Sequence, residues 1–210
     1  MSAVPTVDEQ DPESLSAVDA VASNVAELSD SYDRRLVGRV AEGDRDAFAE
    51  LYRRHSRVLL AQISLLVGDR ALSEEILQDT MVAVWRGAST FRGDARPRSW
   101  MIAIARRQTR DRTRRRRLTN ADPGLLSEWP DASPGPELQV LDRVEMTAVA
   151  AILPSLRPAH REVLGLVFGA GLTLQEAGDV LKVPVGTVKS RLSAARAALA
   201  EQLLEKGYDR

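Results

Sequence analysis

The residues best suited to chemistry in this sequence are arginines, which fill eight of the twelve positions from 106 to 117. Guanidinium groups at this density neutralise phosphates, and Phe91 and Trp100 just upstream are rings on which bases can stack. Cations at a helix C-terminus gain only about 0.3–1 kcal/mol from the helix dipole, which explains one or two arginines but not eight. The stretch therefore predicts contact with a nucleic acid.

A catalytic or metal centre is not indicated by the sequence. There is no Cys, and the two imidazoles are His55 and His160, so a zinc site is not expected. No nucleophile has a base nearby, no carboxylates have metal spacing, and no Gly-rich phosphate loop follows a strand. We expect no cofactor and no enzymatic activity. A nucleic-acid-modifying enzyme whose acidic residues converge only in the fold remains an alternative.

Composition limits where the protein acts and how many domains it has. With 210 residues, 44% of them hydrophobic, the chain can form one or two domains with real cores. No run approaches the roughly 18 apolar residues of a membrane helix, and the N-terminus has no signal-peptide pattern. We expect a cytoplasmic protein without membrane insertion.

The formal net charge of −1 conceals an uneven distribution. Residues 1–33 contain eight acidic residues and no Lys or Arg, which leaves residues 34–210 at +7. This leader has few large apolar residues to bury, so we expect it to be disordered or weakly helical.

Helices are expected to position the basic stretch. One helical stripe comprises Phe48, Leu51, Tyr52, His55, Leu59, Ile63 and Leu66, in which His55 is expected to be a buried, satisfied imidazole. Gly68 then suits a helix C-terminus and Asp69 an N-cap, so a second helix is expected from 70 to about 86. Its acidic face, with Glu74, Glu75, Gln78 and Asp79, is either solvated surface or a site for a basic partner helix.

A loop and a linker interrupt the helical pattern. Gly93 and Pro97 predict a loop from 90 to 98, after which a helix resumes around Ser99 and continues into the arginines. Residues 119–137 are rich in Pro and Gly and have no sustained period, which is typical of a flexible interdomain linker. We therefore expect a first domain at 34–118 and a second at 138–206.

The second domain has the pattern of a helix-turn-helix. Thr173 and Glu176 form a capping-box motif for a helix that runs to about Leu181. After a short turn, a second helix has its apolar stripe at Val188, Leu192, Ala195, Leu199 and Leu203, which leaves polar and basic residues outward. Helical hairpins of this length also occur in proteins that do not touch DNA.

Two stretches resemble a known family. FRGDARPRSWMIAIAR with its Arg-rich continuation, and LPSLRPAHREVLGLVFGAGLTLQEAGDVLKVPVGTVKSRLSAAR after the linker, are similar to bacterial sigma factors of the extracytoplasmic-function group. The resemblance implies an all-α fold of two small domains, a region 2 bundle and a region 4 helix-turn-helix. It implies that the first domain binds the clamp helices of core RNA polymerase and melts the minus-ten promoter element. The second domain would bind the polymerase flap and read the minus-thirty-five element, and an anti-sigma factor is a further expected partner.

The resemblance also assigns roles to individual residues. The polymerase-facing residues would be Glu75, Gln78 and Asp79. Contacts to the minus-ten element are expected from Phe91, Arg92, Gly93, Arg98, Trp100, Arg106, Arg107 and Arg110. Phosphate contacts are expected from Arg114, Arg115, Arg116 and Arg117, and contacts to the minus-thirty-five element from Gly186, Thr187, Lys189, Ser190, Arg191 and Arg196.

Three positions depart from the family pattern. Arg107 stands where many members have Asn, so a base contact there could become a phosphate contact. Ser193 and Ala194 replace a frequent aromatic or His followed by Arg, which could alter the preferred upstream hexamer. Lys182 replaces a common Gly in the turn, at a cost of roughly 1 kcal/mol if the backbone is left-handed.

These observations predict a promoter-specificity subunit that works with core polymerase. The main alternative is a stand-alone helix-turn-helix regulator that binds operator DNA without polymerase.

Overall fold

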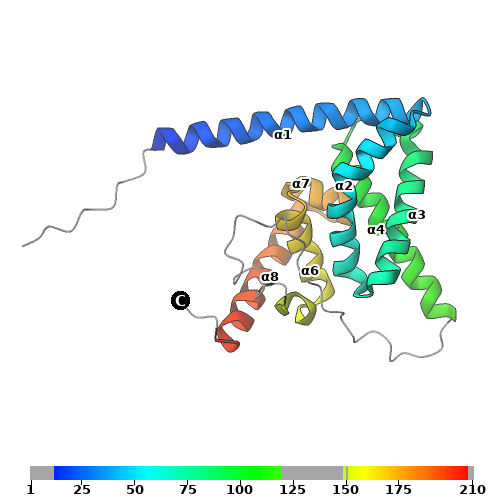
Figure 1. The fold of residues 1–210 in the computed structure, drawn as a ribbon. Helices are drawn as coiled ribbons and strands as arrows, with labels where there is room; N and C mark the ends of the chain where they lie inside the picture. The colour runs from blue at the N-terminus through cyan, green and yellow to red at the C-terminus, as the bar shows by residue number, and fades with distance from the viewer. Residues whose placement is uncertain (1–11, 120–148, 150, 208–210) are drawn as a thin grey trace, which may run out of the picture.

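Helices are the regular secondary structure of this protein wherever the computed structural model describes it, at residues 12–119, 149 and 151–207. Figure 1 shows them as α1 (Pro12–Ala41), α2 (Arg45–Val67), α3 (Arg70–Gly87), α4 (Pro97–Thr119), α6 (Pro158–Leu164), α7 (Leu174–Leu181) and α8 (Val185–Glu205). Short turns add the 3-10 helices η1 (Ala88–Thr90) and η2 (Leu153–Ser155) and the π-helical η3 (Gly165–Gly169). The expected all-α fold is confirmed, and none of the described helices is both long and apolar enough to cross a membrane.

Local sequence signals set the boundaries between α2, α3 and α4. Gly68 ends α2 with φ 73°, and the carboxylate of Asp69 accepts a hydrogen bond from Leu72 N at 3.0 Å. That bond holds the pKa of the Asp69 carboxyl below its usual value. Helix α3 therefore begins where predicted. Helix α4 begins at Pro97, two residues before the expected Ser99, because proline suits the first helical turn.

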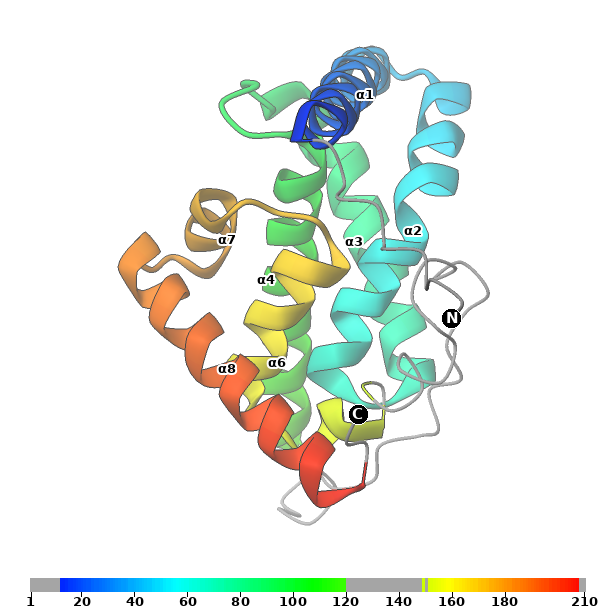
Figure 2. The same ribbon diagram turned by 90° about the vertical axis from the view of Figure 1, so that its left-hand side faces the viewer.

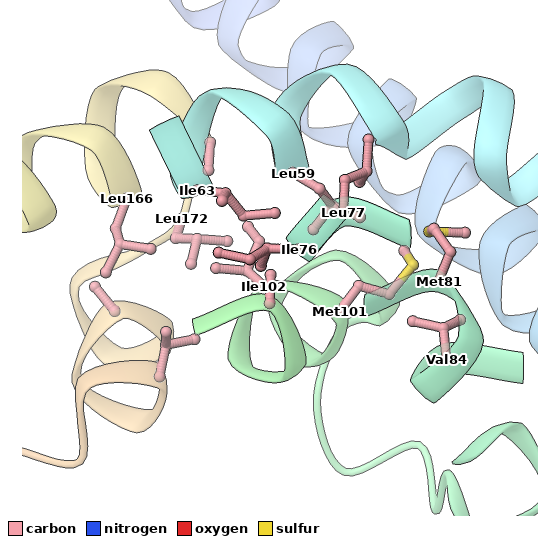
Figure 3. Close-up of a cluster of buried hydrophobic side chains, with 14 of the residues drawn as sticks. Leu59, Ile63, Ile76, Leu77, Met81, Val84, Met101, Ile102, Leu166 and Leu172 are labelled. Carbon is pink, nitrogen blue, oxygen red and sulfur yellow. The ribbon is translucent and has the colours of Figure 1, made fainter. Parts of the chain in front are cut away.

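The N-terminal domain is built from α2, α3 and α4, which lie side by side with the C-terminal part of α1 against them (Figure 2). Its apolar interior is made by Leu51, Leu59, Ile76, Val84, Met101 and Ile102, each at most 1% exposed. Figure 3 shows this cluster with side chains from all three helices directed toward one another. The part of α4 that precedes the basic stretch is therefore anchored in the core of this domain.

Residues 12–33, part of the leader expected to be disordered or weakly helical, belong to helix α1, whereas residues 1–11 lie outside the described residues. Helix α1 is continuous from Pro12, and Figure 1 shows it extending well beyond the bundle. Asp33 is buried: its Oδ2 lies 2.8 Å from His55 Nε2, and its Oδ1 accepts a hydrogen bond from Arg54 Nε at 2.7 Å. The acidic composition was misleading because these partners lie more than 20 residues away in sequence.

The C-terminal domain consists of α6, η3, α7 and α8. The expected capping box is present at α7, with the Thr173 hydroxyl accepting from Glu176 N and the Glu176 carboxylate accepting from Thr173 N. Val188 and Ala195 of α8 are fully buried against this domain. The expected linker at 119–137 and the start of the second domain near 138 lie outside the described residues, apart from Thr119.

The two domains share one apolar core, which the sequence did not predict. Leu166 and Leu172 of the C-terminal domain reach the cluster that contains Ile63 and Ile102 (Figure 3). The C-terminal domain therefore packs against α2 and α4 rather than standing apart from them.

Candidate nucleic-acid interface

The acidic face of α3 is exposed, as its proposed role in binding another protein requires. Glu75, Gln78 and Asp79 all point to solvent on this helix. The end of α4 runs alongside, and Arg112 Nη2 lies 2.6 Å from Glu75 Oε2 while Nη1 lies 3.9 Å from Asp79 Oδ2. A cation from α4 thus partly neutralises this face. The pairing spans 37 residues of sequence, so no local pattern could have indicated it.

The loop between η1 and α4 is held by hydrogen bonds to its backbone. Gly93 has φ 81°, a left-handed conformation that favours glycine, and its carbonyl accepts a hydrogen bond from Arg34 Nη1 at 2.6 Å. Arg92 beside it is exposed. The Ser99 hydroxyl donates to the Arg96 carbonyl at 2.9 Å, which fixes the start of α4.

Two aromatic residues lie near the ends of this loop, Phe91 at its start and Trp100 just after it. The ring centroids of Phe91 and Trp100 are 4.9 Å apart at an interplanar angle of 44°, and both rings are partly buried. In this conformation the rings contact each other.

The arginines of α4 divide into two groups by exposure. Arg107, Arg110, Arg114, Arg115 and Arg116 are exposed on α4, whereas the side chain of Arg117 lies outside the described residues. Arg106 belongs to the other group, because its side chain is only 16% exposed and lies against Glu162 of α6, with Nε 2.5 Å from Oε1. The basic end of α4 is therefore open to a polyanion, except at Arg106, which is the first arginine of the 106–117 stretch.

The second recognition surface lies at the start of α8. Lys189 and Ser190 are exposed, Thr187 and Arg191 are partly exposed, and the Ser190 hydroxyl donates to the Thr187 carbonyl at 3.0 Å. Gly186 is exposed and has open space where a Cβ would lie. Arg196, one further turn along, lies 5.5 Å over the exposed ring of Phe168.

The turn before α8 contains the strained residue that the sequence suggested. Lys182 has φ 60° and ψ 45°, and within the described residues it is the one non-glycine residue with positive φ. A left-handed conformation costs an L-residue roughly 1–2 kcal/mol. Lys182, the third departure from the family pattern, therefore strains the backbone of this turn.

Comparisons with known proteins agree with this arrangement. The family model for Sigma-70 region 2 matches residues 51–119, and the model for Sigma-70 region 4 matches residues 152–201. A chain that is 34% identical over 81% of this one and 94% of its own length is the RNA polymerase sigma factor CnrH of Cupriavidus metallidurans. This chain belongs to the sigma-70 family.

Other relatives place this sigma factor in the extracytoplasmic-function group. The ECF RNA polymerase sigma factor SigM of Mycobacterium tuberculosis is 34% identical over 81% of this chain and 84% of its own length. Among solved structures, CnrH in complex with the cytosolic domain of CnrY matches with a TM-score of 0.61 and 29% identity, covering 84% of this chain and 99% of that one. The sigma factor RpoE from Bartonella quintana, solved with the anti-sigma factor NepR, shares the fold with a TM-score of 0.63 at 24% identity, covering 74% of this chain and 96% of that one.

Proposed function

We propose that this sigma factor binds core RNA polymerase through the exposed face of α3 and reads promoter DNA through two separate surfaces. The minus-ten element contacts the 91–98 loop and α4, and the minus-thirty-five element contacts the start of α8. The observation that carries the proposal is the presence of both sigma-70 regions in order, each with charged side chains directed outward. The protein acts in the cytoplasm, where polymerase and DNA are found.

The contact with polymerase depends on the carboxylates of α3. A basic clamp helix would compete with Arg112 for Glu75 and Asp79, and the exchange of one exposed cation for another is inexpensive because such ion pairs contribute only about 0–1 kcal/mol. The contact is therefore available to an incoming partner without any rearrangement of the fold.

Reversal of one charge on this face tests the polymerase contact. Asp79→Arg sets a cation against both Arg112 and a basic partner, so we expect core binding to weaken by about 2–4 kcal/mol. Glu42→Arg, at an exposed position after α1, is the matched control and should bind core like the wild-type protein. Unchanged affinity of Asp79→Arg in a titration with core polymerase would discard the assignment of this face.

Core-dependent transcription distinguishes this function from that of a stand-alone regulator. Purified protein should initiate run-off transcripts from discrete sites on genomic fragments when core polymerase is added, and should bind duplex promoter DNA poorly by itself. A shift of duplex DNA without polymerase, together with no transcript, would favour the regulator. Activity on nucleic acid without polymerase that a chelator abolishes would favour an enzyme.

An anti-sigma factor is a further proposed partner. The relative CnrH was solved with the cytosolic domain of CnrY, and that pairing suggests an inhibitor of similar kind for this chain. Such a protein would reduce core-dependent transcription in proportion to its concentration, and added core polymerase would reverse the effect.

A further inference from the structure

Helix α1 passes beside the loop that joins η1 to α4, and one of its side chains holds the backbone of that loop (Figure 2). Arg34 Nη1 donates a hydrogen bond to the Gly93 carbonyl at 2.6 Å, across 59 residues of sequence. A hydrogen bond from a charged donor is stronger than one between neutral groups. The Arg34 guanidinium therefore ties the middle of the loop to α1.

The loop has few restraints of its own. Residues 92–95 make no backbone–backbone hydrogen bond within the part of the chain that the structure describes, and the nearest such bonds are donated by Phe91 N and Trp100 N. Gly93 has φ 81°, but glycine populates positive and negative φ about equally, so its residue type does not select this conformation. The bond from Arg34 favours one of the conformations that are open to Gly93.

A second contact from α1 lies one helical turn away. Asp30 precedes Arg34 by four residues, so the two side chains share one face of the helix. Asp30 Oδ2 lies 3.2 Å from Arg96 Nε, and the charges of Arg96 and Arg34 oppose the rise that burial causes in the pKa of Asp30. Helix α1 thus contacts the loop at its middle and near its end. Glu176 Oε1 lies 3.5 Å from the same Arg96 nitrogen, so Arg34 is the more selective residue to change.

The part of α1 that carries these contacts is anchored in the N-terminal domain. Leu36 and Val37 are buried in its core, and Asp33 Oδ2 lies 2.8 Å from the buried His55 Nε2. A site supported by a packed helix is held more precisely than one that depends on a loop alone. The outward side of the loop remains open, because the side chains of residues 92, 94 and 95 are exposed.

We propose that Arg34 is a specificity-determining residue for the minus-ten element, which acts by positioning the 91–98 loop and not by touching DNA. This inference rests on the proposed role of that loop in reading the minus-ten strand. A recognition site distinguishes bases only when its contacts are held in place, so a loop released from α1 accepts different bases with more similar affinity. Loss of the bond to Gly93 should therefore relax base preference at the minus-ten element alone.

Mobility of the loop in the free protein is the first measurement. Because the chain has no Cys, a nitroxide can be attached at Asp94→Cys, an exposed position beside Gly93. We expect Arg34→Ala to make this label more mobile in its electron paramagnetic resonance spectrum. Arg35→Ala is the matched control, because this neighbouring arginine is also exposed but donates to Ser31 of α1 itself. Identical spectra for Arg34→Ala and the wild-type residue would overturn the proposal.

Promoter selection with core polymerase measures the effect on specificity. Active promoters are selected from a library randomised at both elements, with the wild-type, Arg34→Ala and Arg35→Ala proteins. We expect Arg34→Ala to lower the preference for the favoured base about fivefold at one or two minus-ten positions, and to leave the minus-thirty-five preference unchanged. Arg35→Ala should change neither preference. An unchanged minus-ten preference in Arg34→Ala, or equal relaxation at both elements, would contradict the positioning role.

A double-mutant cycle separates positioning from direct contact with DNA. Gly93→Ala disturbs the loop itself, since a Cβ at this position would lie 3.1 Å from Arg34 Nη1 and the positive φ is unfavourable for alanine. If Arg34 acts through the loop, Arg34→Ala should relax the minus-ten preference little further in the Gly93→Ala background. Effects that multiply in the double variant would show that Arg34 acts independently of the loop, against the proposal.

The salt dependence of activity gives an independent measure of direct contact. Loss of one phosphate contact lowers the slope of log activity against log salt by about 1, so Arg34→Ala should leave the slope as it is in the wild-type protein. A slope lowered by about 1 would mean that Arg34 binds a phosphate, and the positioning role would be wrong.

Run-off transcription separates this inference from the function on which it rests. Normal transcription by the wild-type chain, together with the same minus-ten preference in wild type and Arg34→Ala, would overturn the positioning role and leave the function intact. No transcription by the wild-type, Arg34→Ala or Arg35→Ala protein would overturn the function itself, and the specificity role of Arg34 with it.

Discussion

The two DNA-facing surfaces contain similar residues but differ in how accessible those residues are. Lys189 and Ser190 at the start of α8 are exposed, and the ring beneath Arg196 comes from the same domain. Arg106 of the N-terminal domain is only 16% exposed and pairs with Glu162 of the C-terminal domain, whereas Arg98 is exposed although it donates a hydrogen bond to the Ala170 carbonyl. The residue types of a surface therefore indicate what that surface can bind. The position of the surface relative to the other domain decides whether its residues are accessible.

The largest expected effect concerns the exposed arginines at the end of α4. Replacement of Arg114 to Arg117 by Ala removes up to four phosphate contacts, so we expect activity to fall about 10- to 100-fold on all promoters alike. The slope of log activity against log salt should decrease by roughly 3. Run-off transcription over a salt series measures both, with Arg45→Ala as the control. A loss confined to some promoters would mean that these arginines read sequence.

The buried carboxylate of Asp33 stabilises the N-terminal domain, which contains one of the two DNA-facing surfaces. Asp33→Asn weakens the hydrogen bonds with His55 and Arg54, and we expect it to lower the free energy of unfolding by roughly 2–3 kcal/mol. Asp46→Asn, at an exposed site, should have a much smaller effect. Chemical denaturation of both variants measures the difference, and equal losses would contradict the role assigned to Asp33.

The stabilisation that Asp33 provides should depend on pH in a predictable direction. Burial raises the pKa of Asp33, but the hydrogen bonds from His55 and Arg54 outweigh burial, and the net pKa lies below its ordinary value. A lowered folded-state pKa stabilises the protein above the unfolded value of about 3.9, and this contribution is lost as the pH falls through the folded-state pKa. The stability difference between wild type and Asp33→Asn should therefore shrink in acid. A difference that grew in acid would contradict this account.

The α8 surface should control only the upstream element. Lys189→Ala removes an exposed donor from the recognition helix, and we expect a loss of about 1–3 kcal/mol in discrimination at one position of the minus-thirty-five element. Preferences at the minus-ten element should stay the same. Transcription from a set of single-base promoter variants measures both, and a changed minus-ten preference would show that the surfaces are coupled.

The smallest expected effect concerns the strained turn. Lys182→Gly removes the cost of a left-handed Lys and should stabilise the C-terminal domain by about 1 kcal/mol without altering promoter preference. Lys206→Gly, at a position with φ −89°, is the control and should bring no gain. Thermal unfolding would show the difference, and a destabilised Lys182→Gly protein would mean that the Lys side chain makes a contribution larger than the strain.

The features predictable from sequence were those determined by neighbouring residues. The Asp69 cap, the Gly68 terminus and the Thr173 capping box depend on residues at most four positions apart, and all were anticipated. The pairing of Arg106 with Glu162 spans 56 residues and that of Arg112 with Glu75 spans 37, so neither leaves a local pattern. The order within α1 was missed for the same reason.

Glycines illustrate the same limit. Gly93 was expected in a loop, and its positive φ agrees with that expectation. Gly165 gave no signal, because its role is to let the η3 backbone approach Gln62 and Leu65 of α2. Only the packing of the two domains reveals that requirement.

The most direct test of the account is promoter selection with exchanged recognition segments. Residues 91–98 or residues 186–196 are replaced by those of another sigma factor of the same group, and active promoters are selected from a randomised library with core polymerase. The account predicts that the first exchange changes only the selected minus-ten sequences and the second changes only the minus-thirty-five sequences. Exchange of 91–98 that altered the selected minus-thirty-five sequences would contradict the claim that the two surfaces read DNA independently.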